Sequence, residues 1–197
     1  TLEPPLTTTF AYDNLDRRIS TTDMAGKVTH ARYDSRDNVG KTVDARLDYT
    51  VYAYDGLGRN TSQAHYDSAD THMATVQQAF DLNGRMITRT DPKNYTTQYT
   101  YDMFNRSDGV IYADGSRMAV LAFDALGRAT QVQKPDGTVV TNTYDVSGNL
   151  LHRQTTPASG VMEVDETYTY DDLDRVLTET MAATAANTMA TSTTYAY

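Results

Sequence analysis

The amino-acid sequence predicts an all-β fold in which tandem β-hairpins form one long, curved antiparallel sheet. Three features support this prediction: a six-residue motif recurs from one end of the chain to the other, the segments between its copies alternate with strand periodicity, and turn-forming residues end each segment. A sequence that repeats at a fixed period forms a repeat architecture, in which each unit is stabilised by its neighbours.

The recurring motif consists of Tyr or Phe, then Asp, two variable residues, one of Gly, Asp or Asn, and finally Arg or Asn. Its copies begin at Tyr12, Tyr33, Tyr54, Phe80, Tyr101, Phe123, Tyr144 and Tyr170, and Tyr197 stands where a ninth copy would start. The unit is therefore about 21 residues long, and it is lengthened by about five residues in three places. Residues 1–197 are predicted to form a single array of about eight repeats.

The segment that leads into each motif has the periodicity of a β-strand. In "YTTQYTY" (95–101), alternate residues from Tyr95 to Tyr101 fall on one face and the intervening Thr and Gln residues on the other. Aromatic and β-branched residues suit a pleated surface. Similar segments are "KVTHARY" (27–33), "TVVTNTY" (138–144) and "EVDETYTY" (163–170), and none leaves room for a helix of ordinary length.

Each motif also predicts a hairpin turn. The Asp side chain can accept a hydrogen bond from a backbone N–H two residues further on, and Gly, Asp or Asn at the fifth position tolerates a left-handed backbone. We expect a four-residue loop, with the aromatic residue and the Arg facing each other across the hairpin, as in Tyr12 and Arg17, Tyr54 and Arg59, or Tyr101 and Arg106. A guanidinium beside an exposed ring would contribute about 0.5–1 kcal/mol.

Because the motif recurs in every unit, its Asp residues are expected to set the turns and its aromatic residues to pack one unit on the next. A catalytic site needs one distinct constellation in a cleft, so no catalytic residue is assigned. The residues assigned to the structural motif are Tyr12, Asp13, Arg17, Tyr33, Asp34, Asn38, Tyr54, Asp55, Gly58, Arg59, Phe80, Asp81, Gly84, Arg85, Tyr101, Asp102, Arg106, Phe123, Asp124, Gly127, Arg128, Tyr144, Asp145, Gly148, Asn149, Tyr170, Asp171 and Arg175.

A second turn is predicted about halfway through each unit, at "DMAG" (23–26), "DPKN" (91–94), "ADGS" (113–116) and "PDGT" (135–138). One unit is thus two strands and two turns, and the array should contain roughly sixteen strands. The longer units are expected to have their extra residues at this turn, in "DSADTH" (67–72), "TTPASG" (155–160) and "MAATAANT" (181–188), of which the last is also compatible with one helical turn.

Because so wide a sheet twists, we expect it to curl into a spiralling wall. Both of its faces contain many Thr, Ser and Gln residues, so no thick core is expected.

Composition excludes several classes of function. The chain has a net charge of −9 and a pI near 4.7, so it would repel nucleic-acid phosphates, and no basic stripe compensates. No apolar run approaches the ~18 residues of a membrane-spanning helix. The absence of cysteine excludes a disulfide framework and thiolate chemistry. The chain begins without Met and ends within a motif, so we expect it to be a segment of a longer protein.

No cofactor or metal is predicted. His65 and His72 flank a turn that contains Asp67 and Asp70, but their spacing matches no common metal site.

Calcium at an Asp-rich turn, for example at Asp34, Asp37 and Asn38, is an alternative, but the ligand spacing of an EF-hand loop is missing. Neither a G-x-S-x-G elbow nor a glycine-rich phosphate loop is present. The 15 tyrosines and many hydroxyl groups leave open a carbohydrate-binding surface, which the absence of Trp weakens.

The motif copies closely resemble the YD repeats of the Rhs family, which includes bacterial Rhs polymorphic toxins, the B and C components of insecticidal Tc toxins, and animal teneurins. The resemblance covers essentially the whole chain, and "DPKNYTTQYTYD" (91–102) is similar to the family rhythm D-P-x-G-x-x-T-x-Y-x-Y-D, with Asn94 in place of Gly. It implies a hollow, spiralling β-shell that encloses a C-terminal toxin, or in teneurins a large extracellular barrel. The family's D-P-x-G-L-x-G segment, associated with self-cleavage, has no match here, so neither autoproteolysis nor a toxin cargo is assigned to these residues.

The sequence and this resemblance together predict a non-enzymatic wall segment of a YD-repeat shell, which encloses or presents a C-terminal toxin or another polypeptide. The expected partners are neighbouring repeats of the same larger protein and an enclosed toxin domain, with no nucleic acid and no membrane span. The expected location is secreted or at the surface of a bacterium. The alternative is an extracellular adhesion or carbohydrate-binding array, with sugars stacked on exposed tyrosines or peptides added to edge strands.

Overall fold

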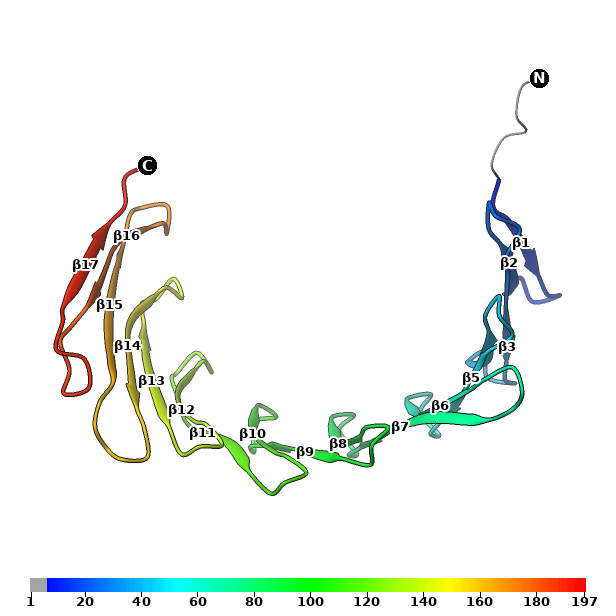
Figure 1. Ribbon diagram of the computed structural model, residues 1–197, viewed down its shortest axis with the longest axis horizontal. Coiled ribbons are helices and arrows are strands. Elements are labelled where there is room, and N and C mark those ends of the chain that lie inside the picture. Colours follow the sequence, from blue (N-terminus) through cyan, green and yellow to red (C-terminus); the bar gives the residue numbers. More distant parts are fainter. Residues whose placement is uncertain (1–6) are drawn as a thin grey trace. The chain divides into compact units, whose positions relative to one another are not determined.

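The computed structural model of the protein describes residues 7–197, and these residues contain seventeen β-strands and no helix (Figure 1). The all-β prediction is therefore confirmed, with one strand more than the roughly sixteen expected. Residues 1–6 of the predicted array lie outside the described residues.

The chain forms two compact units that divide between Thr96 and Thr97. The strands of the first unit are β1 (Thr9–Tyr12), β2 (Arg18–Thr22), β3 (Val28–Tyr33), β4 (Val39–Val43), β5 (Tyr49–Tyr54), β6 (Asn60–Tyr66), β7 (His72–Phe80) and β8 (Met86–Thr90). Those of the second are β9 (Thr96–Tyr101), which begins at the boundary, β10 (Ser107–Ile111), β11 (Arg117–Phe123), β12 (Ala129–Gln133), β13 (Val139–Tyr144), β14 (Leu150–Thr156), β15 (Val164–Tyr170), β16 (Val176–Met181) and β17 (Thr191–Thr194).

Within each unit, every strand pairs in antiparallel orientation with the next strand along the chain (Figure 1). The turns of such a meander alternate between the two edges at which the strands end. The motif turns of each unit therefore share one edge, which we call the motif edge, and the other turns share the opposite edge, which we call the second-turn edge.

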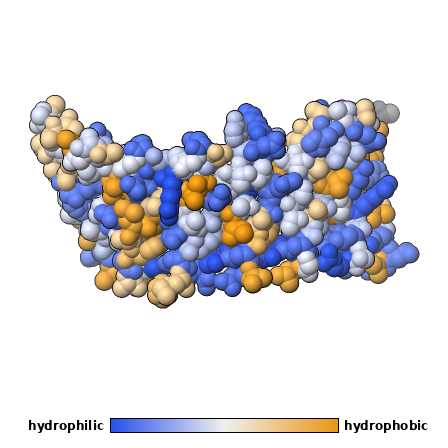
Figure 2. Space-filling model, turned by 90° about the horizontal axis from the view of Figure 1, so that it is seen from below, coloured by the Kyte–Doolittle hydropathy of each residue, from blue (hydrophilic) through white to orange (hydrophobic). Residues whose placement is uncertain are grey.

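The sheet has almost no core, as predicted. Among the described residues only Thr50, Gly109 and Ala119 are buried, and no side chain is fully enclosed. Figure 2 shows hydrophobic residues interspersed with hydrophilic ones over the visible face, without one continuous apolar patch. Stability must therefore come from the hydrogen-bond ladders and from contacts between successive hairpins, as in other repeat proteins.

The extra residues of the longer units lie mainly in the turn in one of three places, at residues 182–190, so that prediction is wrong for the turn at Asp67 and only partly right for the turn at Pro157. Around Asp67 the turn is short, and β6 and β7 are lengthened to seven and nine residues. Around Pro157 the extra residues are shared, because the connection spans residues 157–163, longer than the one at 67–71, and β14 and β15 also have seven residues each. Residues added to paired strands gain partners for their backbone groups, whereas residues added to a loop need water or side chains.

The third insertion is a long connection, residues 182–190, between β16 and β17. It contains a bend and no helical turn, so the helical alternative is not adopted there.

The turn residues adopt the left-handed backbone that the motif predicts. At the fifth motif position φ lies between 58° and 103° in Asp16, Asp37, Gly58, Gly84, Asn105, Gly127, Gly148 and Asp174. Asn94, which stands where the family has Gly, has φ = 64°. Leu47, with φ = 71°, is the one left-handed residue among those described that is not Gly, Asp or Asn, and a Leu side chain disfavours this conformation.

Replacing Leu47 with Asn should raise the free energy of unfolding by about 1 kcal/mol, because Asn tolerates the left-handed conformation. Little packing would be lost, since Leu47 is 64% exposed. Urea denaturation followed by circular dichroism measures the change. The matched control is Asp16→Asn, at a left-handed position already held by a tolerant residue; a Leu47→Asn variant no more stable than wild type would contradict the prediction.

Candidate functional site, a ladder of repeat motifs

The motif turn is well represented by the copy that joins β11 to β12. The N–H of Gly127 donates to the C=O of Asp124 (3.0 Å), and the N–H of Asp124 donates to the C=O of Arg128 (2.9 Å). These bonds define a three-residue loop, a type I turn followed by a left-handed residue. Both bonds occur in all eight motif copies.

This geometry corrects the predicted four-residue loop. Phe123 lies opposite Ala129, the residue after the motif, and the same offset pairs Tyr54 with Asn60. The left-handed residue adds one position to the returning strand as a bulge, so the motif Asp and Arg close the loop, and the aromatic residue does not face its own Arg.

Each motif Asp uses both carboxylate oxygens within its own turn. In Asp124, Oδ1 accepts the N–H groups of Leu126 and Arg128 (both 2.9 Å), and Oδ2 accepts a hydrogen bond from Nε of Arg128 (2.5 Å). The other Asp–Arg ion pairs, with N···O distances of 2.6–2.7 Å, are Asp13–Arg17, Asp55–Arg59, Asp81–Arg85, Asp102–Arg106 and Asp171–Arg175. Where Asn replaces Arg, its side-chain amide donates to the same oxygen, in Asn38 to Asp34 (3.0 Å) and in Asn149 to Asp145 (2.9 Å).

The rest of the guanidinium reaches the next motif. Nη1 of Arg128 donates to the C=O of Asp145 (2.8 Å), and Cζ of Arg128 lies 4.9 Å from the centre of the Tyr144 ring. The same ring contact occurs in Arg17 over Tyr33 (4.8 Å), Arg59 over Phe80 (4.8 Å), Arg106 over Phe123 (3.8 Å) and Arg175 over Tyr197 (4.2 Å). The predicted contact between Arg and ring is therefore present, but its ring belongs to the following repeat.

Tyrosine hydroxyls strengthen this connection in the reverse direction. Several of them donate to the C=O of the residue that follows the preceding motif, in Tyr33 to Arg18 (3.0 Å), Tyr54 to Val39 (2.9 Å), Tyr170 to Leu150 (2.8 Å) and Tyr197 to Val176 (3.1 Å). Phe80 and Phe123 have no hydroxyl group to make this bond. We call the set of Asp, Arg or Asn, and aromatic contacts within each unit the motif ladder.

Arg36 is a ladder residue that the sequence interpretation missed. It occupies a variable position of the motif whose sixth residue is Asn38, and its Nη1 donates to the C=O of Asp55 (3.2 Å). This is the bond to the next motif that Arg59 makes to Asp81 (2.9 Å). The signal in the sequence was an Arg two residues before the Asn that replaces the usual Arg.

Hydrogen bonds to the motif carboxylates change their pKa values. Arg17 holds the pKa of Asp13 below its ordinary value of 3.8, Arg175 does the same for Asp171, and the amide of Asn38 does so for Asp34. Backbone N–H groups act in the same direction, and partial desolvation opposes them.

The His and Asp side chains in and around the Asp67 turn each bond to other groups of the first unit. Nδ1 of His65 bonds to Thr50 Oγ1 (2.8 Å), whereas His72 bonds through Nε2 to Thr75 Oγ1 (2.6 Å). Asp67 accepts two backbone N–H groups of its own turn, and Asp70 accepts the hydroxyl of Tyr49 (2.7 Å), which raises the pKa of Tyr49 to about 12. Within residues 7–197 no group of three or more His, Cys, Asp or Glu side chains is placed to hold a metal ion.

The candidate calcium ligands are engaged in the same way. Oδ1 of Asp34 accepts the N–H groups of Arg36 and Asn38, and Asp37 pairs with Nη1 of Arg17 (2.6 Å).

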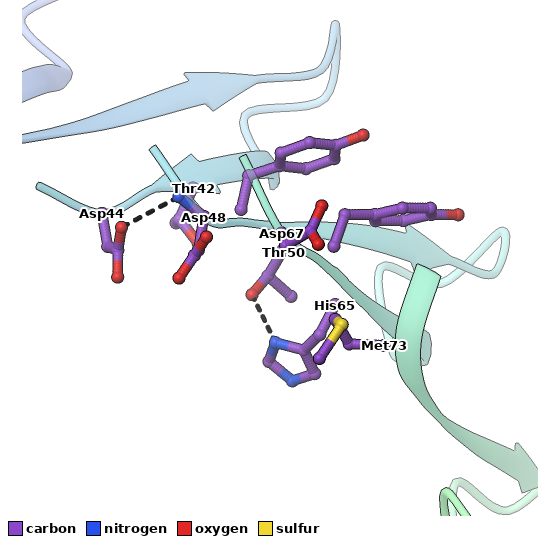
Figure 3. A pocket seen from close by; sticks show the side chains of 9 residues that line it. Thr42, Asp44, Asp48, Thr50, His65, Asp67 and Met73 are labelled. Atoms are coloured by element: carbon purple, nitrogen blue, oxygen red, sulfur yellow. Dashed lines mark hydrogen bonds between the residues drawn. The ribbon is translucent and has the colours of Figure 1, made fainter. Parts of the chain in front are cut away.

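A shallow hollow of about 300 Å³ in the first unit is lined by His65 and Asp67 among other residues (Figure 3). Asp44 and Asp48 line it, and their carboxylates accept the N–H groups of Asp48 and Ser68, respectively (both 3.0 Å). Among the titratable groups that line it, these carboxylates and His65, which bonds to the hydroxyl of Thr50, are thus already bonded within the sheet.

The tyrosines near this hollow already contact other side chains. The rings of Tyr49 and Tyr66 stack with their centres 4.9 Å apart, and Nζ of Lys41 lies 3.3 Å from the centre of the Tyr49 ring. These contacts use ring surface on which a sugar would otherwise stack.

Replacing Arg36 with Leu, the residue type at this position in several other motifs, should lower the midpoint of thermal unfolding by a few degrees, because the C=O of Asp55 loses its donor. Adding Asn38→Arg to this variant should restore the midpoint. Circular dichroism measures both. Arg46→Leu, at the equivalent position of a second turn, is the control, and a double variant no more stable than Arg36→Leu would refute this assignment.

The lowered carboxyl pKa values predict stability that decreases in acid. A group whose pKa is lower in the folded state contributes stability that is complete above its ordinary pKa and is lost as pH falls through its folded pKa. The free energy of unfolding should thus decrease below about pH 4, and Asp171→Asn should make that decrease shallower. Urea denaturation across this pH range tests it. Asp172→Asn, which leaves the Asp171–Arg175 pair intact, is the control; equal acid sensitivity in wild type and Asp171→Asn would count against the prediction.

Comparisons with known proteins agree with the fold. A search of curated proteins finds no match. The structure described as TcdB2-TccC3-Cdc42 is similar to 88% of this chain, with 14% identity and a TM-score of 0.59, and that described as TcdB2-TccC3 also to 88%, with 13% identity and a TM-score of 0.56. A third, TcdB2-TccC3 without its hypervariable C-terminal region, is similar to 89%, with 14% identity and a TM-score of 0.50.

At these identities the likeness concerns the fold alone. The chain spans only 11–12% of the length of the solved chains that it matches. The family model described as Teneurin YD-shell matches residues 6–161, most of the sequence. The predicted relationship to YD-repeat proteins is confirmed, and the chain belongs to the Teneurin YD-shell family.

Proposed function

We propose that this chain is a structural, non-enzymatic wall segment of a YD-repeat shell, which encloses or presents another polypeptide of the same larger protein. The observation that supports this proposal is a sheet one layer thick, with almost no buried side chains, held together by a motif ladder that repeats from hairpin to hairpin. A sheet of this kind is a barrier in itself, because it needs no second layer to fix its strands.

The mechanism that we propose is confinement. Antiparallel pairing satisfies the backbone N–H and C=O groups within each unit, so the faces offer few main-chain groups to an enclosed polypeptide. The motif ladder fixes the distance between successive hairpins, because each guanidinium contacts two repeats at once. A cargo behind such a wall would be shielded from proteases and from its targets.

An enzymatic role has little support in the geometry. The recurring carboxylates and guanidinium groups bond to one another in nearly every repeat, with the same distances, whereas a catalytic pair needs a free proton acceptor beside a nucleophile.

The relatives suggest where such a wall occurs. One similar structure is described as TcdB2-TccC3 without its hypervariable C-terminal region, so that relative has such a region. By analogy, we place this chain in a secreted or surface-exposed bacterial protein, as one array of about eight repeats beside further repeats. An acidic surface disfavours nucleic acid, and no helix among the described residues is long and apolar enough to cross a membrane.

Limited proteolysis of the full-length protein that contains this chain tests the proposal. The segment of that protein which the wall encloses should resist thermolysin in the intact protein. It should become several-fold more sensitive when Arg106 and Arg128 are both replaced by Ala. The control is Arg153→Ala, because Arg153 lies on β14, away from the motif turns, and makes only a 3.7 Å ion pair with Glu166.

Two results would overturn the proposal. In the first, thermolysin digests the segment that the wall is proposed to enclose equally fast whether the array is present or deleted. In the second, a soluble glycan binds the array, and Tyr95→Ala abolishes binding without lowering stability, because Tyr95 is 59% exposed and lies outside the motif. The second result would establish the carbohydrate-binding alternative.

A further inference from the structure

A single strip of this sheet, one strand length in height, is not tall enough to enclose a folded domain. Strands β10 to β16 contain five to seven residues, which at about 3.3 Å per residue gives a height of roughly 17–23 Å. A small domain is about 30 Å across. If the chain is a wall segment, the wall must therefore contain strips that lie edge to edge, and this inference rests on the proposed function.

A backbone ladder cannot join such strips, because at both edges the strands end in turns. Each motif turn is closed by two backbone hydrogen bonds of its own, and the second-turn edge also has the longer connections 157–163 and 182–190. Contacts between strips must come from the side chains at the tips of the turns.

The motif edge of the second unit has apolar side chains at every tip. The third or fourth motif position holds Met103 and Phe104 in the β9–β10 turn, Leu126 in the β11–β12 turn, Val146 in the β13–β14 turn and Leu173 in the β15–β16 turn, and these side chains are 87%, 70%, 68%, 94% and 73% exposed. Isolated exposed apolar residues are common, but an apolar residue at one of the two tip positions in four successive motif turns makes a row. We call this row the tip ridge.

The first unit has a similar row of its own, formed by Leu15, Leu57 and Leu82, which are 68%, 74% and 101% exposed. Its one interruption is Arg36, which bonds to the C=O of Asp55 instead. The turn that contains Arg36 is thus the one motif turn among the described residues with no apolar side chain at either tip position.

The spacing of the tip ridge restricts its partner. Successive tips are two strands apart, about 9.6 Å, so a partner must offer apolar sites at that interval. A second strip of two-strand repeats has this period, whereas one face of an α-helix repeats every 5.4 Å. A bilayer is a poor partner for the tip ridge, because its apolar tips are separated by Asp–Arg pairs and the chain is acidic, whereas membrane binding favours a continuous apolar face with basic residues.

The second-turn edge has apolar side chains to receive the tips. In the second unit Tyr112, Val161 and Met189 are 39%, 45% and 69% exposed at this edge. They lie in three of its four connections, and the exception is the turn at Pro135. Strips stacked in one orientation bring the motif edge of one against the second-turn edge of the next.

We propose that the tip ridge is an interstrip contact, which docks on the second-turn edge of another strip of YD hairpins. The contact is heterologous, so it extends a wall in height and leaves one edge open for the next strip.

Disulfide cross-linking between copies of this chain tests the contact, because the chain has no cysteine of its own. Val146→Cys places one thiol on the tip ridge, and Ser159→Cys places one in an exposed second turn. On mild oxidation of a concentrated mixture, the mixed disulfide should form several-fold faster than either same-site disulfide.

The role of the apolar tips is tested in the Val146→Cys background. Replacing Phe104, Leu126 and Leu173 with Ser should reduce the mixed disulfide several-fold. The matched control replaces Leu121, Leu151 and Leu177, which are 50%, 39% and 37% exposed on strands β11, β14 and β16, with Ser. Far-UV circular dichroism confirms that each variant is folded, and the single variant Leu126→Ser serves if the triple variant is not.

Three outcomes would overturn the contact. In the first, disulfides between two copies of the Val146→Cys variant form as fast as the mixed disulfides. In the second, the Leu121, Leu151 and Leu177 control loses as much mixed disulfide as the Phe104, Leu126 and Leu173 variant, and in the third, Val146→Cys with intact tips forms no more mixed disulfide than that variant. None of them would refute the wall itself, which protease protection in the full-length protein decides separately. Loss of protection together with intact cross-linking would instead refute the wall and leave the contact as self-association of the chain.

Discussion

The arginine that ends most copies of the motif is the group on which the rest of the sheet depends, because it bonds to two repeats at once. In Arg128, Nε binds the carboxylate of its own turn, Nη1 binds the backbone of the next turn, and the guanidinium lies over the next aromatic ring. A lysine could not make these contacts together, since its ammonium is a single point of charge, whereas guanidinium is planar with donors in a fixed fork. The spacing of hairpins therefore follows from the shape of one side chain.

A sheet built in this way does not need a core. Almost every described side chain retains some exposure, and stability is shared among contacts between neighbouring hairpins. A change in one motif can therefore be compensated locally. Asn38 keeps the bond to its own Asp while Arg36 supplies the bond to the next motif, and the amide of Asn149 also donates to Asp174 of the next motif (2.7 Å).

The same arrangement favours a wall over a binding site. Motif carboxylates, guanidinium groups and aromatic rings bond to one another, and what remains for other molecules is the two faces and the row of tips. The family match and the similar folds are consistent with that assignment, while the short strands imply that one strip forms only part of the height of an enclosure.

The sequence by itself determined the all-β fold, the hairpin repeat, the lack of a core and the left-handed fifth position, because period, strand alternation and turn chemistry are local properties. Only the tertiary structure decided which ring each Arg contacts, since the bulge at the left-handed residue moves the Arg out of register with its own aromatic residue and toward the next. The structure also decided that residues near Asp67 extend strands, and that Arg36 replaces a missing donor, because both depend on neighbours about twenty residues away.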